Sequence, residues 1–257
     1  MPADSVSEAV CSLCAGSGWK IVERDGMSGA ERCDCALKAG TVRIEERAGI
    51  PPLYADKSIH NFVLPADNPV GMSALTAPLN DVRTFIRKYP VLPKPGLLFI
   101  GAPGTGKTHL AVAVLRGLIV KGFEGVFFDF QNLLDRIRSG YDTASGTMDK
   151  EAYRTALETD VLVLDDLGAH RVTDWVEDTV TSIITYRCNH RKSTIVTTNL
   201  RDEQAGDERG SGIRSDLGAK YFLEERIGMR ARSRLFEMCT LIKMPAVEDY
   251  RLRKRSL

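Results

Sequence analysis

The sequence lacks the features that mark several large classes of protein. Its 257 residues contain no apolar run near the roughly 18–20 residues that a membrane-spanning helix needs, and MPADSVSEAV is not a basic-then-apolar secretion signal. The formal net charge is only +1, so a nucleic acid would have to be bound through local basic patches. We therefore expect a soluble, cytoplasmic protein with no membrane partner.

Cysteine is scarce except at the N-terminus, and histidine is absent from the stretch between Cys14 and Cys33. Four of the six cysteines form two close pairs, Cys11-x₂-Cys14 and Cys33-x-Cys35. In the cytosol such clusters hold a metal more often than a disulfide. Four thiolates suit Zn²⁺, and the metal would supply folding energy that so short a segment cannot obtain from a core. A redox-active pair and unliganded thiols remain the alternatives.

The rest of the chain divides into a connector and one long α/β domain. The length allows a domain of roughly 170–190 residues plus a small appendage. We expect a cysteine-rich zinc-binding module over residues 1–45, a linker over 46–73 and the large domain over 74–257. Residues 50–70 contain four prolines and two aromatic residues, which predicts an extended segment lying on the large domain.

Apolar spacing in the large domain alternates between the two periods of regular structure. The predicted helices cover residues 74–89, 107–120, 131–138, 152–158, 175–190 and 221–238. The predicted strands cover residues 97–100, 125–130, 161–164, 194–197 and 240–243, with polar loops over 139–150 and 201–218. Such alternation indicates a parallel sheet covered by helices on both faces.

One glycine-rich loop identifies a nucleotide-binding function. GAPGTGKTHLAVAVL follows the predicted strand and opens a helix, and it matches G-x-x-x-x-G-K-T without a mismatch. The backbone N–H groups of such a loop cradle phosphates. Lys107 is expected to reach the β- and γ-phosphates, and the hydroxyl of Thr108 to bind Mg²⁺. The nucleotide-contacting residues predicted here are Gly101, Pro103, Gly104, Thr105, Gly106, Lys107, Thr108 and His109.

Two later strands end in polar residues that complete such a site. VLVLDDLG places Asp165 and Asp166 at a strand's carboxyl end, where open α/β sheets bind ligands. Asp165 is expected to hold Mg²⁺ through its water shell, and Asp166 to orient and deprotonate the attacking water. STIVTTN ends at Asn199, which can position that water or sense the γ-phosphate, although a turn-forming asparagine is, by itself, the more common explanation.

Taken in order, GAPGTGKTHLA, VLVLDDLG, TIVTTNL, SRLFEMC and the terminal DYR resemble the AAA+ ATPases of the DnaC/DnaI helicase-loader type, with IstB and DnaA as relatives. The likeness covers about residues 11–253. It implies the fold class α/β: a P-loop AAA+ three-layer α/β/α domain with a parallel sheet, no separate C-terminal lid domain and a small N-terminal zinc-binding module. It implies an ATPase that uses ATP, Mg²⁺ and Zn²⁺.

The resemblance also assigns roles to arginines. Arg234, in the SRL motif, matches the arginine finger that reaches a neighbouring subunit's γ-phosphate. Arg226, Arg230 and Arg234 recur every four residues, so on one continuous helix they share a face, where like charges need an anionic partner. Arg230 is therefore a further catalytic candidate. Arg251 matches the sensor-2 position, although it can equally belong to the basic RLRKR tail.

The sequence departs from the family pattern in two places. The second acidic residue is Asp166 where most AAA+ enzymes have glutamate, and the shorter side chain predicts slow hydrolysis, suited to a switch. Residues 202–220 (DEQAGDERGSGIRSDLGAK) are longer and richer in glycine than the usual connection, which predicts a flexible tether and puts the placement of Arg226 in question.

The implied function is loading of a replicative DnaB-type helicase at origins or restart sites, in a self-associated, ATP-bound assembly on single-stranded DNA. The cysteine module would dock on the helicase. Arg136, Arg138 and Tyr141 are the candidate DNA contacts, since paired arginines beside an aromatic ring can track phosphates and stack on a base. A solvated helix end explains the same arginines as well. The alternative function is an IstB-like ATP-binding helper of a transposase; the intact site argues against an adaptor with vestigial hydrolysis.

Overall fold

The computed structural model describes residues 11–15, 17, 19–24, 27–33, 35, 46–65, 67–142, 148–169, 173–203, 206 and 221–253. The chain separates into two compact units, Met1–Arg47 and Ala48–Leu257. Among the helices in these ranges, none combines the length and the apolar character needed to cross a membrane.

The first unit contains an antiparallel hairpin that the sequence did not predict. Strands β1 (Trp19–Arg24) and β2 (Met27–Arg32) pair from Trp19 opposite Arg32 to Arg24 opposite Met27. The side chains of Trp19 and Ile21 are largely exposed, so two strands alone bury little apolar surface. A two-stranded hairpin is marginal in water by itself, which leaves the cysteines that flank it as the source of further stability.

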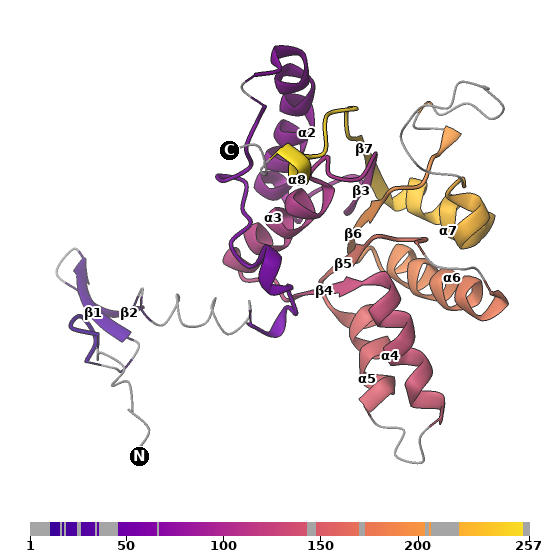
Figure 1. Cartoon of the computed structure of the whole chain (residues 1–257). Coiled ribbons are helices and arrows are strands. Elements are labelled where there is room, and N and C mark those ends of the chain that lie inside the picture. Colours follow the sequence, from indigo (N-terminus) through magenta and orange to yellow (C-terminus); the bar gives the residue numbers. More distant parts are fainter. Residues whose placement is uncertain are drawn as a thin grey trace, which may run out of the picture. The chain divides into compact units, whose positions relative to one another are not determined.

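The second unit is built on a five-stranded parallel sheet (Figure 1). Its strands are β3 (Gly96–Ile100), β4 (Gly125–Asp129), β5 (Val161–Asp165), β6 (Ser193–Thr198) and β7 (Cys239–Lys243). The spatial order is β4-β5-β6-β3-β7, and every pairing is parallel. The parallel sheet is therefore as predicted, and all its carboxyl ends lie at one edge.

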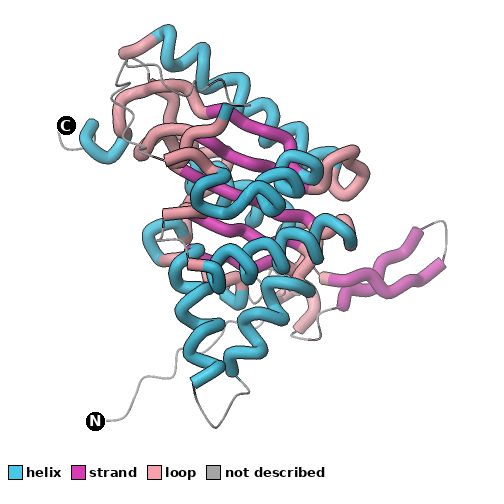
Figure 2. The backbone as a smooth tube through the Cα atoms, turned by 90° about the vertical axis from the view of Figure 1, so that its right-hand side faces the viewer, coloured by secondary structure: helices cyan, strands magenta, loops and turns pink. Residues whose placement is uncertain are grey.

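Helices cover both faces of the sheet, which is why β3, β5 and β6 are buried along their whole length. Helix α3 (Lys107–Val120) packs on one face with α2 (Pro69–Lys88) beside it. Figure 2 shows the strands side by side with helices crossing in front of them. The opposite layer contains α4 (Phe130–Asp142), α5 (Met148–Glu158), α6 (Asp174–Asn189) and α7 (Glu224–Met238).

Several helix boundaries differ from the expected ones. Helix α2 begins at Pro69 instead of residue 74, because the Asn68 side chain accepts a hydrogen bond from Gly71 N at 2.8 Å and proline suits the first helical position. Helices α4 and α5 extend into the stretch predicted as a loop over 139–150. The short elements η1 (Pro52–Tyr54) and α8 (Tyr250–Arg253) were not predicted.

Residues 48–65 belong to the second unit, where they lie against the sheet and α3. Ala48 is fully buried, and its carbonyl accepts a hydrogen bond from Phe127 N at 2.7 Å. Further along, the carbonyl of Ser58 lies 2.8 Å from Nε2 of His109 at the start of α3. The proline-rich segment is thereby held beside the glycine-rich loop.

Helix α7 is broken at Gly228, so the prediction of one continuous helix over 221–238 is wrong. Gly228 has φ +78° and ψ 155°, and a Cβ at this position would overlap the side chain of Glu177 on α6. Arg226 lies before the break and its guanidinium stacks 3.8 Å from the centre of the Tyr221 ring. Arg226 therefore does not continue the helical face of Arg230 and Arg234, contrary to the four-residue spacing.

A buried arginine fastens the amino-terminal ends of two central strands. Arg187 of α6 has no exposed surface, and its guanidinium donates to the Thr194 hydroxyl at 2.9 Å. Its other donors reach backbone carbonyls in the last turn of α5, just before β5 and at the start of β6, namely those of Ala156, Leu157, Thr159, Asp160 and Ser193. Burial lowers the pKa of Arg187 to about 9. The carbonyl cage replaces a carboxylate as the partner of this charge.

Candidate nucleotide-binding site

The glycine-rich loop joins β3 to α3 in the curled form that phosphate binding needs. Gly104 and Gly106 have φ +74° and +93°, in the left-handed region that glycine adopts without strain. Gly106 is also the residue that precedes the first turn of α3. The Thr105 hydroxyl donates to the carbonyl of Ala102 at 2.9 Å and closes the loop on itself. Gly101 stands at its entrance and Pro103 is exposed on its crest.

Lys107 lies inside this loop. Its side chain is buried, and Nζ donates to the carbonyls of Gly101 at 2.9 Å and Ala102 at 2.7 Å. Burial lowers the pKa of Lys107 to about 8, although Asp166 and Asp165 partly oppose the shift. The ammonium group is thus held within the loop by neutral oxygens, which a phosphate would have to replace.

A set of oxygen ligands lies at the end of β5. The Asp165 carboxylate accepts hydrogen bonds from the Thr108 hydroxyl at 2.9 Å and from the Thr197 hydroxyl at 2.6 Å. Burial raises the pKa of Asp165, and these two hydroxyls act against that rise. A hydroxyl and a carboxylate in contact are the hard oxygen donors that Mg²⁺ prefers. The structure therefore brings together the two side chains predicted to bind the metal, and it adds Thr197, which no sequence motif had indicated.

Asp166 and Asn199 form the polar end of the same edge. Asn199 Nδ2 donates to Asp166 Oδ1 at 2.6 Å, which joins the ends of β5 and β6. Asp166 has φ +57°, and its backbone N donates to the Thr197 hydroxyl at 2.9 Å. Burial raises the pKa of Asp166, while the charge of Lys107 lowers it. A carboxylate aimed by an amide is suited to accept a proton from a bound water.

Two segments far away in the sequence border the loop. On one side, the Phe62 ring packs against Gly106 and lies edge-on to His109, with 5.1 Å between ring centres. Burial lowers the pKa of His109, so a neutral imidazole is favoured here. The sequence predicted His109 as a nucleotide contact but did not identify Phe62. An aromatic ring beside an imidazole forms an apolar wall next to the glycine-rich loop.

On the other side, the segment before α8 lies on the loop. Tyr250 N donates to the carbonyl of Gly104 at 3.2 Å, and a Cβ on Gly104 would overlap the carboxyl group of Asp249. The Arg251 guanidinium donates to both oxygens of Asp249 at 3.1 Å. Arg251 is therefore at the nucleotide site, as the sensor-2 resemblance implies, but in this structure it is paired with Asp249.

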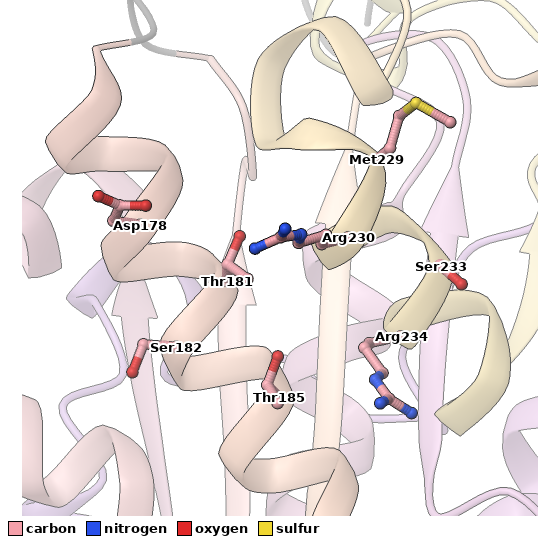
Figure 3. A pocket seen from close by; sticks show the side chains of 8 residues that line it. All are labelled: Asp178, Thr181, Ser182, Thr185, Met229, Arg230, Ser233 and Arg234. Carbon is pink, nitrogen blue, oxygen red and sulfur yellow. The ribbon is translucent and has the colours of Figure 1, made fainter.

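The arginine-finger candidates line a separate groove between α6 and α7, with a volume of about 830 Å³ (Figure 3). The guanidinium of Arg230 extends from α7 toward Thr181 on α6. Arg234 forms an ion pair with Glu237 of its own helix at 2.7 Å. The groove is lined by Asp178, Thr181, Ser182, Thr185, Met229, Arg230, Ser233 and Arg234. None of these residues belongs to the nucleotide site of the same chain, so their action on a nucleotide would require a second chain.

The two arginines among the candidate DNA contacts lie over different aromatic rings. Both arginines are exposed on α4, but the Arg138 guanidinium lies 4.7 Å from the ring centre of Trp175, while that of Arg136 lies 5.6 Å from the ring centre of Phe128. The side chain of Tyr141 lies outside the described residues. The half-buried Trp175 on α6 is an aromatic partner that no sequence pattern had indicated.

The four N-terminal cysteines converge. Their sulfur atoms all lie within 4.8 Å of one another, with 3.8 Å between Cys11 and Cys33 and 3.2 Å between Cys14 and Cys35. The hairpin accounts for this, because one pair precedes β1, the other follows β2, and Trp19 pairs with Arg32. Four thiolates bonded to zinc at about 2.3 Å stand about 3.8 Å apart in tetrahedral geometry. The residues therefore fit a Zn²⁺ ion.

Comparisons with known proteins agree with this site. A family model described as IstB-like ATP binding protein matches residues 89–208. A crystal structure of the DnaC helicase loader is 33% identical, with a TM-score of 0.59, over 76% of this chain and 100% of that one. The replicative helicase loader DnaC of Escherichia coli (strain K12) is 25% identical over 162 residues, 63% of each chain. The uncharacterized protein YqaM of Bacillus subtilis (strain 168) is 24% identical over 80% of this chain and 66% of its own length. These two alignments each span less than two thirds of the relative.

Proposed function

Because this chain belongs to the AAA+ family that contains the IstB-like ATP-binding proteins and the DnaC-type helicase loaders, we propose that it is a cytoplasmic, ATP-dependent loader of a replicative DnaB-type helicase. The observation that carries the proposal is the 33% identity to a DnaC helicase loader along the whole of that chain. The second support is the nucleotide site, where the residues of a P-loop ATPase lie in mutual contact at one edge of the sheet.

The proposed nucleotide chemistry follows from the contacts of the site. Lys107 would leave the carbonyls of Gly101 and Ala102 and bind the β- and γ-phosphates. Thr108 and Asp165 would hold Mg²⁺, which neutralises developing charge on the phosphates when it is bound. Asp166, oriented by Asn199, would accept a proton from the attacking water. Because Asp166 has a shorter side chain than glutamate, we expect slow turnover, as suits an assembly switch.

Completion of the site by a neighbouring copy is the second part of the proposal. Arg230 and Arg234 lie in the groove between α6 and α7, where they can act only on a nucleotide held by another chain. Arg234, the family's finger position, would exchange its ion pair with Glu237 for the γ-phosphate. An arginine supplied in this way contributes about 10³–10⁵ in rate in well-studied systems. Arg234→Ala should leave ATP affinity near normal and reduce DNA-stimulated hydrolysis.

The cysteine module is proposed to hold zinc and to dock on the helicase. The exposed Trp19 and Ile21 on the hairpin provide apolar surface that a protein partner could cover. Native mass spectrometry of the full chain should find one zinc ion. Cys11→Ser with Cys14→Ser should abolish it and weaken helicase capture, while ATP binding by the large domain persists. A metal-free but folded module would contradict the zinc assignment, and unchanged capture would contradict the docking role.

Contact with single-stranded DNA is proposed through α4, where Arg136 and Arg138 are exposed. Arg138 and Trp175 together offer a cation and a ring at one surface. Arg138→Ala should weaken binding of an oligonucleotide and reduce the salt dependence of that binding by about one counterion. Arg83→Ala on α2 is the matched control, because Arg83 is also an exposed helical arginine.

A transposase helper is the second candidate function, because the family model that matches residues 89–208 is described as IstB-like. Capture from extracts of the native host with the full chain, with and without a non-hydrolysable ATP analogue, separates the two. Recovery of a hexameric helicase supports the loader, and recovery of a transposase supports the helper. Lys107→Ala is the control that should lose every nucleotide-dependent partner; tight ATP binding by that variant would contradict the P-loop assignment.

A further inference from the structure

A short path leads from the nucleotide site to the helix that carries the exposed arginines. Asn199, whose amide bonds Asp166, stands directly after β6, and Asp202 follows three residues later. The Asp202 side chain is buried, contrary to the expectation that a flexible tether begins there. Residues 204–205 and 207–220 of that predicted tether lie outside the described part of the chain. Only two residues therefore separate Asn199 from Asp202.

Asp202 is bound by Arg232 of α7 in a two-pronged ion pair. Arg232 Nε donates to one carboxylate oxygen at 2.6 Å and Nη2 to the other at 2.8 Å. The Asp202 side chain is 2% exposed and that of Arg232 is 19% exposed, so water screens the pair little. The fork of a guanidinium on a carboxylate fixes direction as well as distance, which makes this contact stiff.

The ion pair lies beyond the break in α7. Before Gly228, residues 221–223 are joined to Arg201, the neighbour of Asp202, by backbone hydrogen bonds. Arg201 N donates to Tyr221 O, and Leu223 N donates to Arg201 O. After Gly228, Arg232 is the residue that bonds Asp202, two positions from both Arg230 and Arg234. Residues two apart on a helix point to nearly opposite sides. On one side of the helical segment, Arg232 is therefore bound to Asp202. On the opposite side, Arg230 and Arg234 line the groove between α6 and α7.

We propose that the Asp202–Arg232 ion pair is a positioning contact that couples the nucleotide state sensed at Asn199 to the placement of Arg230 and Arg234 in the groove. This inference rests on the proposed function and deepens it. Nucleotide binding in one subunit would determine the position of the two arginines that act on the nucleotide of its neighbour. Gly228 lets the segment 229–238 move as a unit, and the ion pair determines which way it moves. Neither Asp202 nor Arg232 touches the nucleotide in this arrangement.

The test is hydrogen exchange of the full-length protein with and without Mg²⁺ and a non-hydrolysable ATP analogue. In the native protein, the analogue should change exchange at residues 229–238 by about threefold or more, beyond its effect on the glycine-rich loop. Removing both charges together in Asp202→Asn/Arg232→Met avoids an unpaired buried carboxylate. This variant should bind the analogue with unchanged affinity and lose the response of 229–238. The single variant Arg232→Lys keeps a positive charge beside Asp202, so it should retain part of the response that the double variant loses. Arg83→Met should respond as the native protein does.

A catalytic readout distinguishes positioning from structural support. Hydrolysis per subunit by the native protein should rise with protein concentration, and Asp202→Asn/Arg232→Met should remove that rise at unchanged ATP affinity. In that background Arg234→Ala should have no further effect. Two results would overturn the coupling and leave the proposed function standing. One is that residues 229–238 of the double variant respond to the analogue as they do in the native protein. The other is that these residues do not respond in the native protein although the glycine-rich loop does. No response even at the loop overturns both.

Discussion

The protonation state of Lys107 gives a quantitative prediction for ATP binding. The Lys107 ammonium group donates hydrogen bonds to two carbonyls, and burial lowers its pKa to about 8. The charged form is the one that attracts phosphates, and a bound triphosphate would raise the pKa again. Because the group is a base with a lowered pKa, it loses its proton as pH rises through about 8. ATP affinity should therefore fall over the same range.

The magnitude follows from the fraction of protein that carries the charge. With a pKa of about 8, Lys107 is about nine-tenths protonated at pH 7 and about one-tenth protonated at pH 9. If only the charged form binds well, the apparent affinity drops about tenfold, or roughly 1.4 kcal/mol, over these two pH units.

The assay is equilibrium titration with a fluorescent ATP analogue between pH 7 and pH 9, at saturating Mg²⁺ and constant ionic strength. Lys107→Arg is the matched control, because a guanidinium keeps its charge over the whole range and should give a flat profile. Lys107→Ala should bind weakly at every pH. Equal affinity of the native protein at pH 7 and pH 9 would refute the idea that burial in the loop tunes this lysine.

Two further substitutions test features outside the motifs. Asp249→Asn removes a carboxylate that lies against Gly104 and releases the Arg251 guanidinium from its ion pair. ATP affinity should therefore rise by about fivefold, equivalent to about 1 kcal/mol. Weaker binding in the same titration would show that the carboxylate helps to build the site. Arg187→Met leaves a cage of backbone carbonyls without donors and should lower the free energy of unfolding by about 3–5 kcal/mol in urea denaturation; a loss below about 1 kcal/mol would show that water or rearrangement satisfies the carbonyls.

Much of the nucleotide site could be predicted because its residues are local in the sequence. Gly106, Lys107 and Thr108 are adjacent, and their strand–loop–helix context is set by apolar periodicity on either side. Asp165 ends one buried strand and Asn199 follows the next, and parallel strands align their carboxyl ends. The cysteine pairs were recognised for the same reason, since each pair is a short motif.

The helix α7 shows where spacing was insufficient. Arg226, Arg230 and Arg234 have helical spacing, yet the helix breaks at Gly228, which has a left-handed φ and whose Cβ position is occupied by Glu177. That contact comes from α6, about fifty residues earlier in the chain. A local sequence pattern does not predict a contact with so distant a residue. At this one glycine, tertiary packing therefore overrides the helical periodicity.

The sequence by itself determined the α/β class and the parallel sheet, and it indicated the candidate phosphate and metal ligands, because these depend on residue type and on periods of two and 3.6 residues. Only the tertiary structure decided which distant residues meet at the site: Thr197 on Asp165, Phe62 on Gly106, and Asp249 on the glycine-rich loop. It also decided that Asp202 is buried against Arg232. Such pairings follow from strand order and helix packing, which bring together residues separated by many tens of positions and which no single segment encodes.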